Sequence, residues 1–452
     1  MNRITRRKFL KDQAALGHAA AIAAGTFAAA SPTKVLGANE TVRFALIGCG
    51  GRGRSVAANL IREGGRCVAL CDVDDSSAAS ASDFFEQRAG GGSLPRYKYP
   101  EQVFDRQEVD AVVLALPVHW HAPLTIQACQ AGKDVFVEKP HTHNIWESWQ
   151  VIAAARKYER VVQVGTQNRS AEYNQEARRV IQEGHLGPTH LVKVYNLLGG
   201  GPWRLGEPED PPASLDWDRW LGPAAERPYR RSLYRRGYWR LWDLGGGSHL
   251  SDGIHQMDLA HMLLGDPGLP KSVVATGGRL AHPDDDSQTP DVLACHFEYD
   301  DFVLVFEASE YPAYMRKTPG QVRQGDEFPL WMQNSTRVEL YGRDLMMLVG
   351  RMGGGWQMTA YPWEVKKQMY GRHPDPEHAR NFLECVKSRR SPNADPVSQH
   401  ASISVLHMAN IAHRLGNRKL HWDDQAGQFD DPEANQLIKR QYRSPYVVPE
   451  QV

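Results

Sequence analysis

Apolar runs alternate with stretches of helical spacing along the first 165 residues. Short runs rich in β-branched and apolar residues predict buried strands at 42–47, 67–71, 111–116, 134–137 and 161–165. Between them, apolar positions three and four residues apart predict helices at 54–61, 76–88, 100–105, 122–131 and 144–158. Strands that alternate with helices in this way predict an α/β fold with a doubly wound parallel sheet.

The pattern changes after residue 166. We expect a helix at 170–185, a strand at 189–197 and a helical stretch at 244–264. Strands at 273–276, 292–299, 302–308, 337–341 and 345–348 then follow one another without long helices, which predicts an α+β domain with a largely antiparallel open sheet. Helices are expected at 377–389 and 399–415. The polar tail from His421 is expected to wrap over the surface.

The first 38 residues are typical of an export signal. The segment Thr5–Lys11 contains the pair Arg6-Arg7 in a twin-arginine context, and a weakly apolar, alanine-rich run follows at 14–30. This predicts export by the twin-arginine machinery to the periplasm or beyond, with cleavage after residue 30 or 38. The alternative is a basic tail with a chance arginine pair. The predicted division is thus a signal at 1–38, a nucleotide domain at 39–166 and a substrate and oligomerisation domain at 167–452.

A glycine-rich turn follows the first predicted strand. Residues 48–53 read Gly-Cys-Gly-Gly-Arg-Gly, a G-x-G-x-x-G motif between a strand and a helix. Gly48 permits the tight turn, Gly50 lets the backbone approach a pyrophosphate, and Gly53 lets helix and strand pack closely. With Gly51, this turn and the helix N-terminus are predicted to hold the phosphates of a dinucleotide.

Asp72 supports the same interpretation. It ends the second predicted strand about 20 residues after the turn, where an acid accepts the ribose hydroxyls of NAD. An acid repels a 2′-phosphate, so NAD is favoured over NADP, although Arg52 can pair with a phosphate of either. The alternative is a turn of this kind that binds no nucleotide.

Composition narrows the choice of partners. Lys plus Arg and Asp plus Glu both number 53, so the formal net charge is zero and nothing indicates a nucleic-acid partner. The six cysteines show no metal-ligand spacing, and we expect them to be small buried residues in the reduced state. No metal site is predicted.

Lys139 is the first candidate for chemistry. It follows a predicted strand, between Glu138 and Pro140, at the edge of the sheet where the nicotinamide is expected. Oxidation of a carbinol requires removal of the hydroxyl proton as the hydride leaves, and a lysine there can hold that oxygen and share in the proton relay. The alternative is a solvated surface lysine.

A second candidate set lies in the glycine turn and helix at 245–258. His255 lies three residues after Asp252 and four after Ser251, so all three share one helix face. A carboxylate beside a histidine orients the ring and raises its pKa toward neutrality, which suits a base. The other interpretation is a polar helix start with a capping Asp.

Further candidates flank these segments. Pro117 ends a predicted strand, and His119 or His121 after it can face the nicotinamide, or pack in a loop. The aromatic stretch 199–243 can stack on sugar rings through Trp203 and Trp239, with Arg240 bonding hydroxyls or carboxylates. Its tryptophans can equally belong to a core or an interface.

Together these residues resemble the glucose–fructose oxidoreductase/inositol dehydrogenase (Gfo/Idh/MocA) family. The match is to 48–53, 117–121, 138–140 and the segment that ends in 253–258, and 215–223 and 378–395 resemble an exported bacterial branch. The resemblance implies an N-terminal Rossmann domain, a C-terminal open-sheet domain that often forms the oligomer contact, and NAD(P) chemistry on sugars or cyclitols. It assigns catalytic roles to Lys139 and His255. The family usually has an acid four residues before this histidine, where this chain has Ser251, so Asp252 is the candidate substitute.

Three functions are consistent with these residues. The first is an NAD(P)-dependent oxidoreductase that acts on a carbohydrate or cyclitol hydroxyl, as an expected homo-oligomer. The second is a redox-cycling enzyme that cleaves glycosides with tightly bound NAD, which export favours because NAD is scarce outside the cytoplasm. The third is a non-catalytic sugar-binding protein, against which the retained Lys139 and His255 argue.

Overall fold

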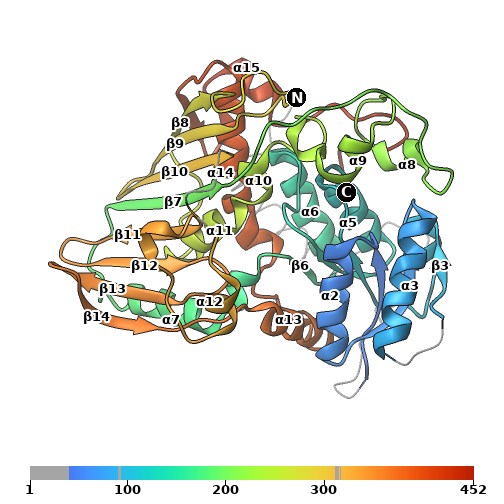
Figure 1. Ribbon diagram of the computed structural model, residues 1–452, viewed down its shortest axis with the longest axis horizontal. Coiled ribbons are helices and arrows are strands. Elements are labelled where there is room, and N and C mark those ends of the chain that lie inside the picture. Colours follow the sequence, from blue (N-terminus) through green and yellow to red (C-terminus); the bar gives the residue numbers. More distant parts are fainter. Residues whose placement is uncertain (1–39, 90–92, 311–314, 316) are drawn as a thin grey trace, which may run out of the picture.

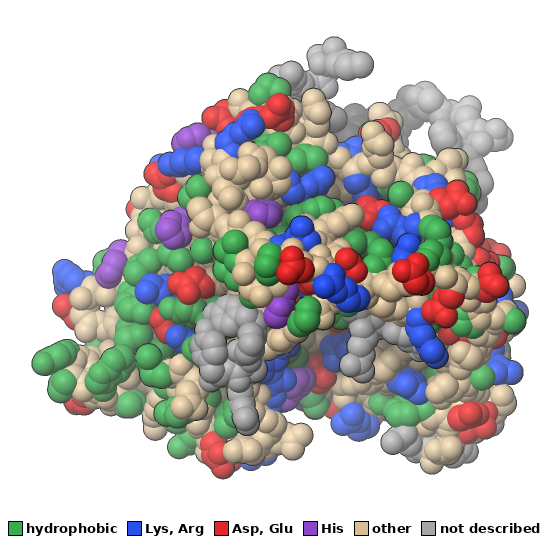
Figure 2. Space-filling view, turned by 45° about the horizontal axis from the view of Figure 1, so that its top comes forward, with side chains coloured by type: hydrophobic (Ala, Val, Ile, Leu, Met, Phe, Trp, Pro, Cys, Tyr) green, Lys and Arg blue, Asp and Glu red, His purple; other side chains and the backbone are tan. Residues whose placement is uncertain are grey.

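The computed structural model describes residues 40–89, 93–310, 315 and 317–452. The predicted signal at 1–38 lies outside the described residues. Within them, no helix combines the length and apolar character needed to cross a bilayer. All six cysteines are buried and unpaired, as expected. Figure 2 shows acidic and basic side chains interspersed over one face, in keeping with the balanced charge.

The N-terminal sheet has six parallel strands in the order β3-β2-β1-β4-β5-β6 (Figure 1). Their bounds are β1 Arg43–Ile47, β2 Arg66–Cys71, β3 Arg96–Tyr97, β4 Ala111–Leu114, β5 Asp134–Val137 and β6 Val162–Val164. The strand order reverses between β1 and β4, and a crevice opens there at the carboxyl ends of the strands. The predicted doubly wound sheet is confirmed, although the two-residue β3 was not expected.

Helices cover both faces of this sheet because each presents an apolar stripe to it. They are α2 Gly51–Arg62, α3 Asp75–Ala89, α4 Pro100–Phe104, α5 His121–Gln130 and α6 Ile145–Lys157. One core joins Phe44 and Leu60 to Phe382 of α13 (Asp375–Ser388), a C-terminal helix that packs against α2 (Figure 1). A second core on the other face holds Ile47 and Val151.

The C-terminal sheet has ten strands in the order β14-β13-β12-β11-β7-β10-β9-β8-β15-β16. The bounds are β7 Leu191–Leu198, β8 Ser272–Gly278, β9 Val292–Glu298, β10 Val303–Glu310, β11 Arg337–Tyr341, β12 Met346–Gly350, β13 Trp356–Ala360, β14 Glu364–Met369, β15 Leu420–Asp423 and β16 Gln428–Phe429. Only β7 and β10 pair in parallel, which confirms the largely antiparallel sheet.

Helices α7 (Glu172–Gln182), α11 (Ile254–Leu263) and α14 (Pro396–Arg414) pack on one face of this sheet (Figure 1). The expectation for the tail was only partly correct. β15 pairs with β8 and extends the sheet, and Val448 is buried against the core of the N-terminal sheet. The polar appearance of the tail hid these few apolar anchors.

Residues 212–221, which we call the strap, run from the second half of the chain back onto the first. Asp75 N donates to Ser214 O at 3.0 Å, and Asp216 N donates to Val73 O at 3.0 Å. The strap ends in α8 (Trp217–Leu221), which lies above α3 in Figure 1, and α9 (Arg231–Arg236) follows. Trp217 and Trp220 stack at 4.7 Å within a separate small core, so much of the aromatic stretch is structural.

Candidate active site

The glycine turn forms an open cradle at the N-terminus of α2. Gly48 has φ +93°, and a Cβ on Gly53 would lie 2.1 Å from Gly48 O, so these two positions are restricted to glycine. A Cβ on Gly50 or Gly51 would meet nothing within 4 Å. Gly50 is the N-cap and has no side chain to bond the first N–H groups of α2, which leaves them directed at an anion.

Asp72 and Arg52 flank the cradle. The half-buried Asp72 carboxylate accepts from Cys49 N at 2.7 Å and from Asp74 N at 2.9 Å, so it is fixed beside the turn. Arg52 forms ion pairs with Glu138 at 2.8 Å and Asp375 at 3.4 Å. Its guanidinium therefore links the turn to the end of β5 and to α13, in addition to its expected place near a phosphate.

An apolar slot continues the crevice beyond Asp72. It lies between the ends of β1, β2 and β4, and its walls include Asp72, Pro117, Trp120, Arg219 and Trp220. The strap thus forms part of the wall of this slot through Arg219 and Trp220. Free helix N–H groups, open glycines and an acid at the end of β2 form a donor and acceptor set that fits a dinucleotide such as NAD.

Lys139 leaves the carboxyl end of β5 and reaches the turn after α10 (Ser248–Ser251). Its Nζ donates to Ser251 O, and two predicted segments 112 residues apart thereby meet. Burial lowers the pKa of Lys139 to about 8, against the opposing attraction of Asp252 and Glu138. A lysine with this pKa can exchange a proton near neutral pH.

Asp252 does not pair with His255. Its carboxylate accepts from Arg351 at 3.0 and 3.1 Å and from Lys317 Nζ at 3.0 Å. Although burial alone would raise the pKa of Asp252, Arg351 and Lys317 hold it below the usual range. The expectation that Asp252 orients the histidine is therefore not what the structure gives, because two cations from later loops occupy the carboxylate.

His255 is the second residue of α11 and is 4% exposed. Burial lowers its pKa well below the ordinary value, and Arg351 and Lys139 lower it further. The expected rise in the pKa of His255 is wrong for this reason. The ring is neutral, and its buried Nδ1 bonds none of the described residues, so it is free to form a hydrogen bond but is a poor base.

A pocket of about 400 Å³ lies in front of Lys139. Its walls bring together five predicted candidates and one cation that the sequence did not reveal: His121, Lys139, Trp239, Arg240, Asp252 and Lys317. His255 is not among the residues that line this pocket. Trp203 does not line it; its ring lies 5.9 Å from the guanidinium of Arg240, behind the wall. Arg240 is held by Glu310 at 2.9 Å and Asp285 at 3.5 Å.

The two histidines after Pro117 differ in position. His119 is fully buried between Trp220 O at 3.0 Å and Leu244 O at 3.3 Å, so it packs the strap against the sheet. His121 Nδ1 lies 2.5 Å from Pro140 O, and its ring borders the pocket. Pro117 itself borders the apolar slot.

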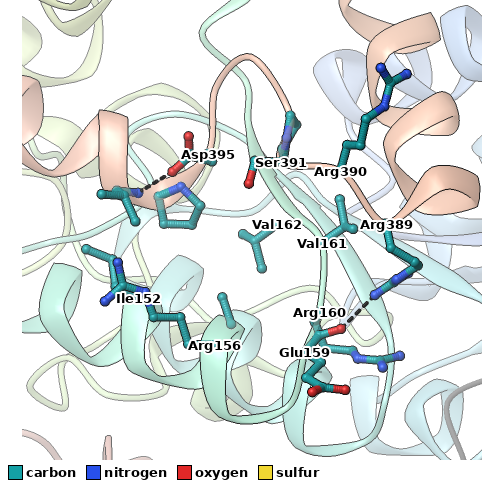
Figure 3. A pocket seen from close by; sticks show the side chains of 14 residues that line it. Ile152, Arg156, Glu159, Arg160, Val161, Val162, Arg389, Arg390, Ser391 and Asp395 are labelled. Atoms are coloured by element: carbon teal, nitrogen blue, oxygen red, sulfur yellow. Dashed lines mark hydrogen bonds between the residues drawn. The ribbon is translucent and has the colours of Figure 1, made fainter. Parts of the chain in front are cut away.

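Another hollow, of about 510 Å³, is larger but is badly placed for this chemistry. Figure 3 shows Arg156, Arg160 and Arg389 around it, beside Val161 and Val162. Those valines stand at the start of β6, which is the amino edge of the sheet, opposite the glycine turn. Ligands of doubly wound sheets bind at the carboxyl edge, so the 400 Å³ pocket is the candidate site.

Asp258 was grouped with the polar face of the predicted helix, and its role is structural. It is fully buried and pairs with Arg169 at 2.7 Å, with further bonds from Gln399 and Ser402. Lys317 and Arg351 were missed altogether. No local motif marks them, because ion pairs across 65 and 99 residues leave no periodic signal.

Three family models match most of the chain. Residues 42–166 match the NAD-binding Rossmann fold of an oxidoreductase family, residues 219–344 match the GFO/IDH/MocA C-terminal domain, and residues 357–448 match the oxidoreductase family's C-terminal alpha/beta domain. The first match covers the cradle, Asp72 and Lys139. The chain therefore carries an NAD-binding Rossmann domain.

Similar proteins include a glycosyl hydrolase family 109 protein from Solibacter usitatus, 29% identical over 244 residues. These are 50% of this chain and 55% of the relative, so the chain spans about half its length. The WlbA dehydrogenase from Bordetella pertussis, solved with NADH and UDP-GlcNAcA, shares the fold at 17% identity, TM-score 0.61, over 85% of this chain and 99% of that one. The aldose-aldose oxidoreductase from Caulobacter crescentus does so at 19% identity, TM-score 0.61, over 85% and 100%.

Proposed function

We propose that this chain, which belongs to the Gfo/Idh/MocA family of NAD-binding oxidoreductases, oxidises or reduces a hydroxyl carbon of a carbohydrate or cyclitol. One observation carries the proposal. Lys139, at the carboxyl end of β5, meets the turn before His255 at the base of a 400 Å³ pocket next to the nucleotide cradle. Proton-handling groups thus lie beside the crevice where the dinucleotide fits.

The chemistry follows from the protonation states. NAD, when bound, accepts the hydride of the carbinol carbon. Neutral Lys139 takes the hydroxyl proton, since its pKa of about 8 leaves a useful neutral fraction near pH 7.5. The neutral His255, whose Nδ1 bonds none of the described residues, supplies a hydrogen-bonding nitrogen near Lys139. Trp239 and Arg240, on the pocket wall, bind the sugar ring and its hydroxyls.

Loss of the proton acceptor tests this function. We expect Lys139→Met to bind NAD normally and to lower kcat/KM by at least about 10²-fold, the usual contribution of a positioned base. The matched control is Lys366→Met, since Lys366 lies on β14 and is similarly paired on the surface. Full activity of Lys139→Met across a panel of sugars and cyclitols would refute the assignment.

A second function, redox-cycling cleavage of glycosides, is favoured by the strap. Residues 214 and 216 bond to the loop after β2, and Trp220 borders the slot, so adenosine would be enclosed and NAD retained through turnover. Transient oxidation of one hydroxyl acidifies the neighbouring C–H. Elimination then expels the aglycone, water adds, and the hydride returns, so no net oxidant is consumed. The relative named as a glycosyl hydrolase family 109 protein supports this alternative.

Retention of the nucleotide separates the two functions. The protein is purified without added nucleotide and denatured, and the released nucleotide is identified by mass spectrometry. About one NAD per chain, with glycoside cleavage, no accumulated NADH and solvent deuterium in the product, supports cycling. NADP in place of NAD would contradict the role of Asp72. Trp220→Ala is expected to speed NAD release at least tenfold, whereas Trp363→Ala, exposed and remote, should not.

Export and assembly are also part of the proposal. The twin-arginine segment supports export of the folded enzyme, and replacement of Arg6 and Arg7 by lysine should retain the protein in the cytoplasmic fraction. The ten-stranded sheet supports a homo-oligomer. A monomeric mass in light scattering at micromolar concentration would contradict that assembly.

A further inference from the structure

We propose that the pocket takes a sugar that bears a carboxylate, and that Lys317 binds this carboxylate. The inference rests on the proposed function, because it names the substrate class of the same site. It comes from the distribution of charge around Asp252, where cations outnumber the anions that neutralise them.

The arginines near the site are already matched. Arg351 is 5% exposed and holds both oxygens of Asp252, at 3.0 and 3.1 Å. Arg52 is shared between Glu138 and Asp375. A bidentate arginine satisfies a carboxylate in geometry as well as in charge, so these anions have little left to offer another cation.

Of the cations that line the pocket, Lys317 and Lys139 remain, since Arg240 is held by Glu310 and Asp285, and Arg323, which is also near Asp252, is not part of the wall. Lys317 contacts only one Asp252 oxygen, at 3.0 Å, and its side chain is 44% exposed on the wall of the pocket. Lys139 has no carboxylate within ion-pair distance; its Nζ donates to Ser251 O. Lysine has three donors, so Lys317 can keep Asp252 and bind a second oxygen from the pocket.

The surplus charge matches a monoanion. Lys139 must be neutral to take the hydroxyl proton, and Lys317 is then the cation left without a full counter-charge. Elsewhere on the wall, Arg240 is outnumbered by its two carboxylate partners, Glu310 and Asp285, so that part favours neutral hydroxyls. The charge on the wall is thus uneven, with an excess cation at Lys317 and an excess of carboxylates beside Arg240. A sugar acid with its carboxylate at Lys317 and its hydroxyls beside Arg240 complements this distribution.

Matched sugars test the proposal on the NAD-loaded protein. Binding of D-glucose, D-galactose and D-mannose, their uronates and their 6-phosphates is measured by calorimetry, without turnover. We expect at least one uronate to bind at least tenfold more tightly than its neutral parent and than its 6-phosphate. Lys317→Met should abolish that preference, because it should lower the affinity for the uronate at least tenfold more than the affinity for the neutral sugar. Lys366→Met, with a lysine of 43% exposure paired on β14, is the control.

Each contrary result is distinct. Equal affinity for uronate and parent, no uronate binding at all, or equal losses for both in Lys317→Met would overturn the carboxylate site. A preference for the 6-phosphate would show that the pocket binds a phosphate group, and this result would also overturn the carboxylate site. Lys317-dependent uronate binding with no change in the redox state of NAD would keep the site and refute the oxidoreductase. Turnover restricted to neutral sugars would refute the carboxylate site and keep the oxidoreductase function.

Discussion

Lys139→Met should make the protein more stable while it removes activity. Burial lowers the pKa of Lys139 from 10.5 to about 8, so holding this ammonium in the fold opposes folding at neutral pH. A shift of about 2.5 units corresponds to about 3 kcal/mol at about 1.4 kcal/mol per unit. Because the side chain is not fully buried, we expect a net gain of about 2 kcal/mol from methionine.

The sign of the stability difference, and the pH range over which it changes, follow from the different proton binding of the folded and unfolded chains. Below pH 8 both folded and unfolded chains hold the proton, and the destabilisation is complete. Between pH 8 and 10.5 the unfolded chain binds more protons than the folded one, so the wild type gains stability as the pH rises. The advantage of Lys139→Met should therefore be full at pH 7 and much smaller by pH 10.

The assay is calorimetry of both proteins at equal NAD content at several pH values. About 2 kcal/mol corresponds to about 2 °C in Tm for a chain of this size. The control is Lys366→Met, because this lysine is 43% exposed and paired with Glu364 on β14, so its replacement should change Tm little. A lower Tm for Lys139→Met at pH 7, or a difference that does not vary with pH, would refute the reasoning.

Three further predictions concern the same framework. Asp258→Asn should cost about 3 kcal/mol, seen as a fall in Tm, because the buried Arg169 loses one of its two carboxylate partners and keeps only Asp266; a neutral result would contradict that role. Gly53→Ala should release NAD on gel filtration, since its Cβ would lie 2.1 Å from Gly48 O, whereas Gly320→Ala, where a Cβ has open space and φ is not positive, should keep it. Asp252→Asn should lower the pKa of Lys139 further and move the alkaline rise of kcat/KM for oxidation to lower pH by on the order of one unit; an unmoved profile would exclude the coupling.

The parts of the site that follow from local chain geometry were predictable. The glycine turn, Asp72 and Lys139 lie at strand ends, and the alternation of apolar runs locates strand ends directly. Asp252 illustrates the limit. Its spacing from His255 is correct for a pair on one helix face, but loops 65 and 99 residues away supply Lys317 and Arg351, which bind it instead.

In the fold too, elements determined by their own residues were predicted, and elements that depend on pairing with distant strands were missed. β11 (Arg337–Tyr341) was predicted at its observed bounds because its residues are β-branched, apolar or paired across the sheet. β13 and β14 were missed because they form an edge hairpin with many polar residues, whose pairing depends on β12. Pairing between distant strands is a property of the assembled sheet, so composition alone did not reveal it.

The strap also determines when the nucleotide site is completed during synthesis. The cradle at residues 48–53 and Asp72 leave the ribosome early, but Asp216, which bonds Tyr99 Oη at 2.9 Å, follows 117 residues after its partner. Until then the N-terminal half can offer only an open crevice, from which a dinucleotide exchanges freely. The nascent chain therefore meets its cofactor first and encloses it later, so the nucleotide pool of the compartment where translation ends decides what the mature protein contains.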